Sequence, residues 1–189
     1  MIEFKTKQQK YLWIEIVFFA SFTAGIVAAN LFGQAKLEQT GILSTYFIQQ
    51  FKYLTISKSD YLIYICGIRI PVVIFLLTFG MTMVYKLIHG GVMAWVGFSL
   101  GFVCVGAISN MGIRAIPVLL ASVLPHYIFY GLGYAAMVRM QWNHHVAHQK
   151  KTMVEWVVLY AIVLVLFLLG ILSETYISLE LTQKILKKF

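Results

Sequence analysis

Five long hydrophobic runs, separated by short polar stretches, make up most of the chain. Each has about the 20 mostly apolar residues that an α-helix needs to cross the hydrocarbon core of a bilayer. The pattern therefore predicts an all-α fold, a polytopic membrane helix bundle of about five transmembrane helices. Their expected bounds are 11–32, 61–85, 91–109, 115–140 and 154–173.

Two further stretches are amphipathic rather than uniformly apolar. In 42–54, Leu43, Phe47 and Phe51 recur every three or four positions, and 176–188 places its apolar residues on one side of a helix in the same way. This periodicity predicts two helices that lie at the membrane surface. The first of them could instead lie against the bundle or dock a partner protein.

Composition supports the membrane class. Of 189 residues, 60% are hydrophobic and only 12% are charged, whereas a soluble domain has about 25% charged residues. No polar stretch is long enough for a separate domain, so we expect one integral membrane domain over 1–189. The net charge is +8, but the lysines flank the predicted spans, which favours contact with membrane lipid and no binding of nucleic acid.

The orientation follows from the loops. The first apolar run is longer than the core of a signal peptide and contains Glu15, so we expect it to be an uncleaved span. Five spans place the two termini on opposite sides. Basic residues divide equally between those sides unless the tail lysines are discounted, in which case a cytoplasmic N-terminus is favoured.

Proline and glycine mark special positions within the spans. Pro71 and Pro125 cannot donate a backbone hydrogen bond, so we expect helix kinks there, and the fourth span could form two half-helices. Gly97 and Gly101 form a small-xxx-small face that lets another helix approach closely.

Four polar side chains fall within or at the edge of the spans, where burying them in hydrocarbon is costly. They are Asn30, Arg69, His126 and Glu174. With the N-terminus inside, Arg69 lies about eight residues, or roughly 12 Å, from the outer end of its span, and all four occupy the outer half of the bundle. A buried arginine needs an acidic or carbonyl partner, and Glu174 is the best-placed carboxylate. The cluster would either fix helix packing or form a polar pocket for a peptide, an ion or a partner helix.

The chain carries little that indicates catalysis. His144 and His148 have the i, i+4 spacing of a zinc-binding H-E-x-x-H helix, but His145 replaces the general-base glutamate. A phosphate-binding loop, a nucleophile elbow and paired carboxylates are absent from the sequence. We therefore expect a basic surface loop and no enzymatic activity, cofactor or metal. An intramembrane enzyme would need a metal at His126 or at the His144/His148 pair.

Three short motifs together resemble the stage II sporulation protein M family. They are Gly-Ile-Val-Ala-Ala-Asn at 25–30, Leu-Pro-His at 124–126 and Ser-Glu-Thr-Tyr-Ile-Ser at 173–178. Five spans with a long first outer loop are also similar to that family. Many members read Pro-His-Gly-x-x-Glu in the fourth span, where this chain has Tyr127 and Tyr130.

The resemblance implies a non-enzymatic, multi-pass subunit of a complex in the bacterial cytoplasmic membrane. Some members of that family accompany ABC-type ATPases in gene clusters for bacteriocins and other exported peptides, and others belong to the machinery that remodels septal peptidoglycan in sporulation. On this basis we expect a permease-like subunit that works with an ABC-type ATPase in peptide export or immunity. The alternative is a membrane scaffold of a cell-envelope complex. The expected partners are a second copy of the chain, the ATPase or an envelope protein.

Overall fold

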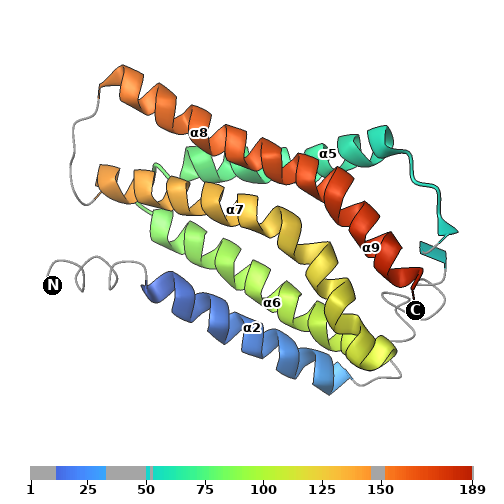
Figure 1. Cartoon of the computed structure of the whole chain (residues 1–189). Coiled ribbons are helices and arrows are strands. Elements are labelled where there is room, and N and C mark those ends of the chain that lie inside the picture. Colours follow the sequence, from blue (N-terminus) through green and yellow to red (C-terminus); the bar gives the residue numbers. More distant parts are fainter. Residues whose placement is uncertain (1–11, 33–49, 52, 146–151, 189) are drawn as a thin grey trace, which may run out of the picture. The chain divides into compact units, whose positions relative to one another are not determined.

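The computed structural model of the protein describes residues 12–32, 50–51, 53–145 and 152–188 (Figure 1). Every regular element in these ranges is a helix, which confirms the predicted all-α class. The elements are α2 (Leu12–Phe32), α5 (Lys58–Phe79), α6 (Tyr85–Met111), η1 (Gly112–Arg114), α7 (Ala115–His145), α8 (Met153–Leu172), η2 (Ser173–Ser178) and α9 (Leu179–Leu186).

Four helical segments of the described chain are long and apolar enough to cross a membrane. They are Leu12–Leu31, Lys58–Phe79, Tyr85–His145 and Met153–Leu186. The third has 61 residues, or about 90 Å at 1.5 Å per residue, which is three times the thickness of a hydrocarbon core. It contains both of the spans expected at 91–109 and 115–140, and the short 3₁₀ turn η1 divides it into α6 and α7.

Capping residues set several helix ends. The Ser57 hydroxyl accepts a hydrogen bond from the Asp60 backbone N–H at 3.4 Å at the start of α5. Thr152 and Glu155 form a reciprocal capping box at the start of α8, which satisfies backbone donors that would otherwise lack a partner. At the end of α6, Gly112 has a φ of +58°, a left-handed conformation that glycine adopts without strain.

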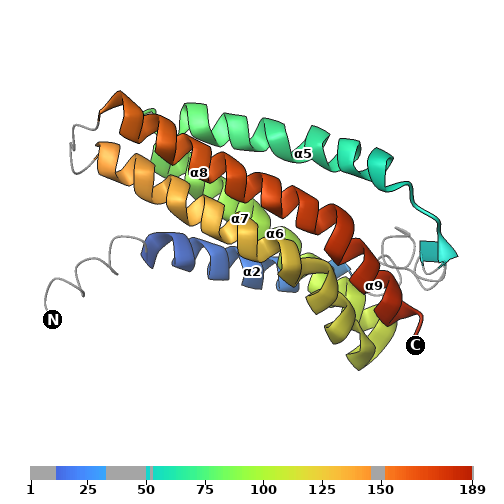
Figure 2. The same cartoon turned by 45° about the horizontal axis from the view of Figure 1, so that its top comes forward.

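Some boundaries differ from those expected. Residues 86–90, which separate the expected second and third spans, are helical and belong to α6, and the second span ends at Phe79 instead of continuing to 85. The last span and the tail form one continuous helical rod from α8 through η2 to α9 (Figure 2). Of the surface helix expected at 42–54, residues 50, 51 and 53 are helical, and residues 42–49 and 52 lie outside the described part.

The chain divides into two compact units. Unit 1 contains α2 and α6 from Lys86 onward, and unit 2 contains residues 50–85 together with α7, α8, η2 and α9. The prediction of a single domain over 1–189 stays a prediction.

In unit 1, the backbones of α2 and α6 meet at glycines. A Cβ on Gly97 would overlap the carbonyl oxygen of Phe18, and one on Gly101 would overlap that of Phe22. Gly25 approaches the backbone of α6 in the same way from the α2 side. The small-residue face expected from the sequence is therefore the surface of α6 that packs against α2. It permits the close van der Waals packing on which helix association in a membrane depends.

The two helices of unit 1 run in the same direction. Gly90 lies beside the ring of Trp13, whereas Gly101, further along α6, lies beside Phe22 and Ile26. α2 and α6 therefore pack in parallel within unit 1.

In unit 2, α5 and α7 also run in the same direction. The Arg69 guanidinium lies over the Tyr130 ring, 5.3 Å from its centroid, and further along both helices the Gln141 side-chain amide donates to the Leu76 carbonyl oxygen at 2.9 Å. Both contacts therefore hold α5 and α7 parallel within unit 2.

The rod of α8, η2 and α9 runs opposite to α7. Gly133 packs on Phe167, and earlier along α7 His126 contacts Ser178, later along the rod. Pro71 and Pro125 lie within α5 and α7 without interrupting either helix. The fourth span is therefore one helix of 31 residues and not two half-helices, although α7 bends in its first half (Figure 2).

The glycine contact in unit 1 makes a direct prediction. We expect Gly97→Leu and Gly101→Leu to lower the thermal unfolding temperature of the purified protein in mild detergent, because the new side chains would force the α2 backbone away at about 1–3 kcal/mol each. Gly91→Leu is the matched control, since nothing lies within 4 Å of its Cβ position. Equal melting of all three variants would contradict the close approach.

Candidate functional site

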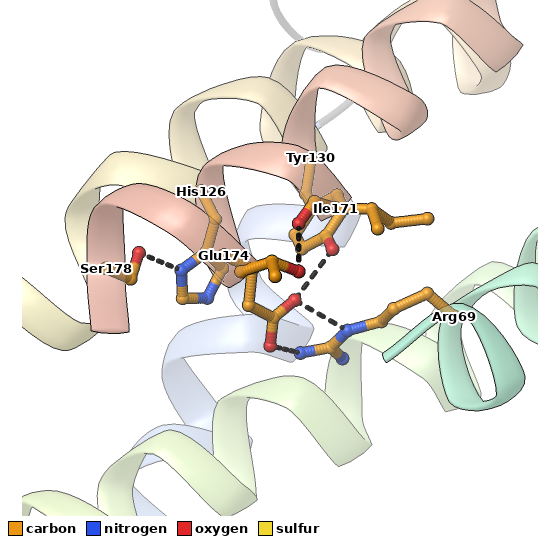
Figure 3. A network of polar contacts seen from close by, with 7 residues as sticks. Arg69, His126, Tyr130, Ile171, Glu174 and Ser178 are labelled. Atoms are coloured by element: carbon orange, nitrogen blue, oxygen red, sulfur yellow. Dashed lines mark hydrogen bonds and ion pairs between the residues drawn. The ribbon is translucent and has the colours of Figure 1, made fainter. Parts of the chain in front are cut away.

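Three segments of unit 2 bring their polar side chains to one place (Figure 3). Arg69 comes from the middle of α5, His126 and Tyr130 come from α7, and Glu174 and Ser178 come from η2. His126 and Tyr130 are one turn apart on α7, so they face the same neighbour. We call these five residues the polar network.

The centre of the polar network is a two-point ion pair. The Arg69 Nε donates to Glu174 Oε2 at 3.1 Å, and its Nη2 donates to Oε1 at 2.7 Å. This fork geometry uses both carboxylate oxygens and is the strongest arrangement that the two side chains can make. The Arg69 side chain keeps 37% of its surface exposed, whereas Glu174 keeps 10%.

Tyr130 completes the coordination of the carboxylate. Its hydroxyl donates to Glu174 Oε2 at 2.7 Å, so three donors reach the two oxygens. The Tyr130 ring also lies under the Arg69 guanidinium, in the position of a cation–π contact. Gly170 makes room for this ring, because a Cβ there would overlap its edge.

His126 and Ser178 form the second part of the polar network. His126 Nδ1 and Ser178 Oγ are 2.9 Å apart, and both residues are buried. The imidazole stands edge-on to the Tyr130 ring, with ring centroids 5.6 Å apart. The hydroxyl and the ring nitrogen therefore satisfy each other away from water, and the aromatic contact joins them to the ion pair.

Glu174 projects from a π-helical segment, η2. The wider turn of a π-helix leaves backbone carbonyls less regularly bonded, and such segments often occur at functional sites. Within it, the Thr175 hydroxyl donates to the Ile171 carbonyl oxygen at 2.9 Å, and the residue is fully buried. Local side-chain bonding thus supports the backbone that presents Glu174 to α5 and α7.

The polar network lies deep in the apolar part of the chain. Arg69 is 11 residues from the start of a 22-residue helix, so at 1.5 Å per residue it lies about 16 Å from either end. If α5 crosses a bilayer, this is the centre of the hydrocarbon core, deeper than the 12 Å expected from the sequence. An isolated charge there would be costly, and pairing within the network reduces that cost.

The structure unites three of the four polar residues singled out in the sequence: Arg69, His126 and Glu174. The fourth, Asn30, belongs to unit 1, where its side-chain amide donates to the Ile26 carbonyl oxygen of the same helix at 2.9 Å. Pro71 lies two residues after Arg69 on α5, and Pro125 directly precedes His126 on α7.

Two members of the polar network, Tyr130 and Ser178, were not recognised from the sequence. Tyr130 was noted only as a departure from a family pattern, although its i, i+4 spacing from His126 places it on the same face of a helix. Ser178 has the same spacing from Glu174. That spacing is a usable signal, but partners on a separate helix cannot be identified from it.

His144 and His145, the last residues of α7, do not join the polar network. His145 stacks on Tyr85 with ring centroids 4.6 Å apart, and its Nε2 lies 3.3 Å from the Gly80 carbonyl oxygen. His148 lies outside the described residues. In the part of the chain that the structure describes, no three His, Cys, Asp or Glu side chains are arranged to hold a metal ion.

Comparisons with known proteins do not assign this chain to a family. No family model, curated protein or solved structure matches this chain. Functional conclusions therefore depend on the chain itself.

The polar network generates a test of stability. Removing one partner leaves the other charge uncompensated, so we expect Arg69→Leu to destabilise the protein by about 3 kcal/mol, at the lower end of the 3–5 kcal/mol for buried pairs because Arg69 is partly exposed. The double variant Arg69→Leu/Glu174→Leu should unfold at a higher temperature than Arg69→Leu alone. Additive losses in a double-mutant cycle would contradict this pairing.

The tyrosine contact is tested separately. Tyr130→Phe keeps the ring but removes the donor to the carboxylate, so we expect a loss of about 1.5–3 kcal/mol, as for hydrogen bonds to charged groups. Tyr64→Phe is the matched control, because that side chain is 62% exposed. Thermal unfolding in the same detergent compares the two, and an equal effect would argue against the Tyr130 bond.

Proposed function

We propose that this chain is a non-enzymatic, multi-pass membrane subunit of a larger complex, and that it acts as a permease-like component with an ABC-type ATPase in peptide export or immunity. The observation that carries the proposal is the polar network at mid-depth of apolar helices. Ionisable residues inside a membrane commonly mark substrate or ion pathways. α5 and α7 each contain a proline close to the network in sequence. Helices that line such pathways are often interrupted by proline or glycine.

The exposure of Arg69 supports a role beyond packing. Two of the guanidinium's five N–H groups are used by Glu174, and more than a third of the side chain is accessible. A peptide carbonyl or carboxylate could accept from the remaining donors. Glu174 would hold the arginine in position for this contact.

A second candidate function is that of a membrane scaffold in a cell-envelope complex. It is favoured by the carboxylate of Glu174, which already receives three donors within unit 2. A carboxylate bonded in this way joins α5, α7 and η2. In this reading the network holds the fold together, and partner proteins bind elsewhere.

A pull-down of the tagged chain from its own host in mild detergent, followed by mass spectrometry, distinguishes the two functions. We expect an ATPase at near-equal stoichiometry. A cell-wall hydrolase or its membrane anchor, with no ATPase, would instead support the scaffold. Recovery of neither class, from membranes in which the tagged chain remains functional, would overturn both assignments to a complex.

The polar network is then tested in function. Arg69→Lys keeps the charge but loses the fork geometry, so we expect peptide export or resistance to fall at least about tenfold while the complex still assembles. Thr78→Val on the same helix is the control, because the Thr78 hydroxyl donates to the carbonyl oxygens of Ile74 and Phe75 within α5. Normal export by Arg69→Lys would favour the scaffold.

A further inference from the structure

One end of unit 2 gathers basic side chains from two segments far apart in the sequence. Figure 1 shows the first residues of α5 and the end of α9 at this end. Lys58 begins α5, and Lys184, Lys187 and Lys188 belong to α9 or follow it directly. We call these four residues the lysine cluster.

Glu180 joins the two parts of the lysine cluster. Its carboxylate pairs with Lys58 through Oε1, and with Lys184 through Oε2 at 3.7 Å. Lys184, Lys187 and Lys188 have i, i+3 and i+4 spacing, so they lie on one face of the helix. The opposite face is buried through Leu179, Thr182 and Leu186, and the basic face is therefore exposed.

A further contact fixes the position of α9. The Gln183 side-chain amide reaches the carbonyl oxygens of Phe51 and Leu54 at 3.3 and 3.0 Å. The lysines of α9 are thus held beside the chain that leads into α5. The lysine cluster is a defined surface of unit 2 and not the end of a free tail.

The lysine cluster lies at the level of lipid headgroups. The 22 residues of α5 measure about 33 Å, close to the thickness of a hydrocarbon core, so Lys58 at its start lies at one boundary. Three exposed tyrosines occur at the same end of unit 2: Tyr53, Tyr64 and Tyr176. Tyrosines of this kind form the aromatic belt at a membrane–water boundary, and Tyr176 also lies 5.6 Å from the Lys58 ammonium.

We propose that the lysine cluster binds the headgroups of anionic phospholipids. Among the described residues at this end, the four lysines outnumber the two acidic side chains, Glu180 and Asp60, by two. The side chain of Lys184 is 71% exposed. A lipid phosphate can therefore reach its ammonium group and bridge it to a neighbouring lysine. Lipid phosphates are the anions that this level of a membrane supplies.

Native mass spectrometry of the full chain in neutral detergent tests the proposal. The protein is offered equal amounts of phosphatidylglycerol and phosphatidylcholine with the same acyl chains. We expect wild-type protein to retain mainly phosphatidylglycerol. In the K184Q/K187Q/K188Q variant the ratio of bound phosphatidylglycerol to bound phosphatidylcholine should fall at least about fivefold, because each lysine near a membrane surface attracts anionic lipid. Glu180→Gln should strengthen the preference by removing a repelling carboxylate.

Matched controls make the result decisive. K86Q/R114Q/R139Q removes the same amount of charge elsewhere and should change the preference by less than about twofold. Lys58→Gln supplies a second loss variant if the triple variant unfolds. The proposal is overturned if the cluster variants keep the wild-type preference, or if the control loses as much. Displacement of the lipid by inorganic phosphate alone would also overturn it, because the surface would then bind free anions.

Discussion

A charge placed at the middle of an apolar helix must be neutralised by a partner, and most features of unit 2 follow from this requirement. Arg69 lies about 16 Å from both ends of α5, where water is distant if the helix spans a bilayer. Glu174 supplies the opposite charge, and the fork geometry fixes the distance and rotation of η2 relative to α5. Tyr130 extends the same constraint to α7. One carboxylate thus sets the arrangement of three helical segments.

The described part of unit 1 is held together by close packing of two helices and not by a buried ion pair. α2 and α6 meet at glycines that allow backbone to approach backbone, and dispersion over a close surface replaces charge pairing. Such contacts are specific in shape, and bulk added to either surface separates the helices. Charge pairing in unit 2 has the opposite property, because it tolerates changes in volume more readily than the loss of one partner. The two units therefore differ in the kinds of substitution that they accept.

The polar network bears differently on the two proposed functions. The π-helical segment η2 places Glu174 and Ser178 on the side facing α5 and α7. Besides the Lys58–Glu180 pair, the Arg69–Glu174 pair joins α5 to the rod of α8, η2 and α9. In the proposed permease-like subunit Arg69 would contact the peptide from this position, and in a scaffold the same bonds would maintain one arrangement.

The fold class follows from the amino-acid pattern alone, because a run of about 20 apolar residues can satisfy its backbone hydrogen bonds within a membrane by forming a helix. The sequence also indicated that Arg69 and Glu174 would pair, because few carboxylates were available and a buried guanidinium requires one. It could not show that Tyr130 and Ser178 join them, that Asn30 bonds within its own helix, or that η2 continues the last span as a π-helix. These points emerge from the folded arrangement, because hydrogen bonds between separate helices depend on their register and rotation, and local periodicity carries no information about either.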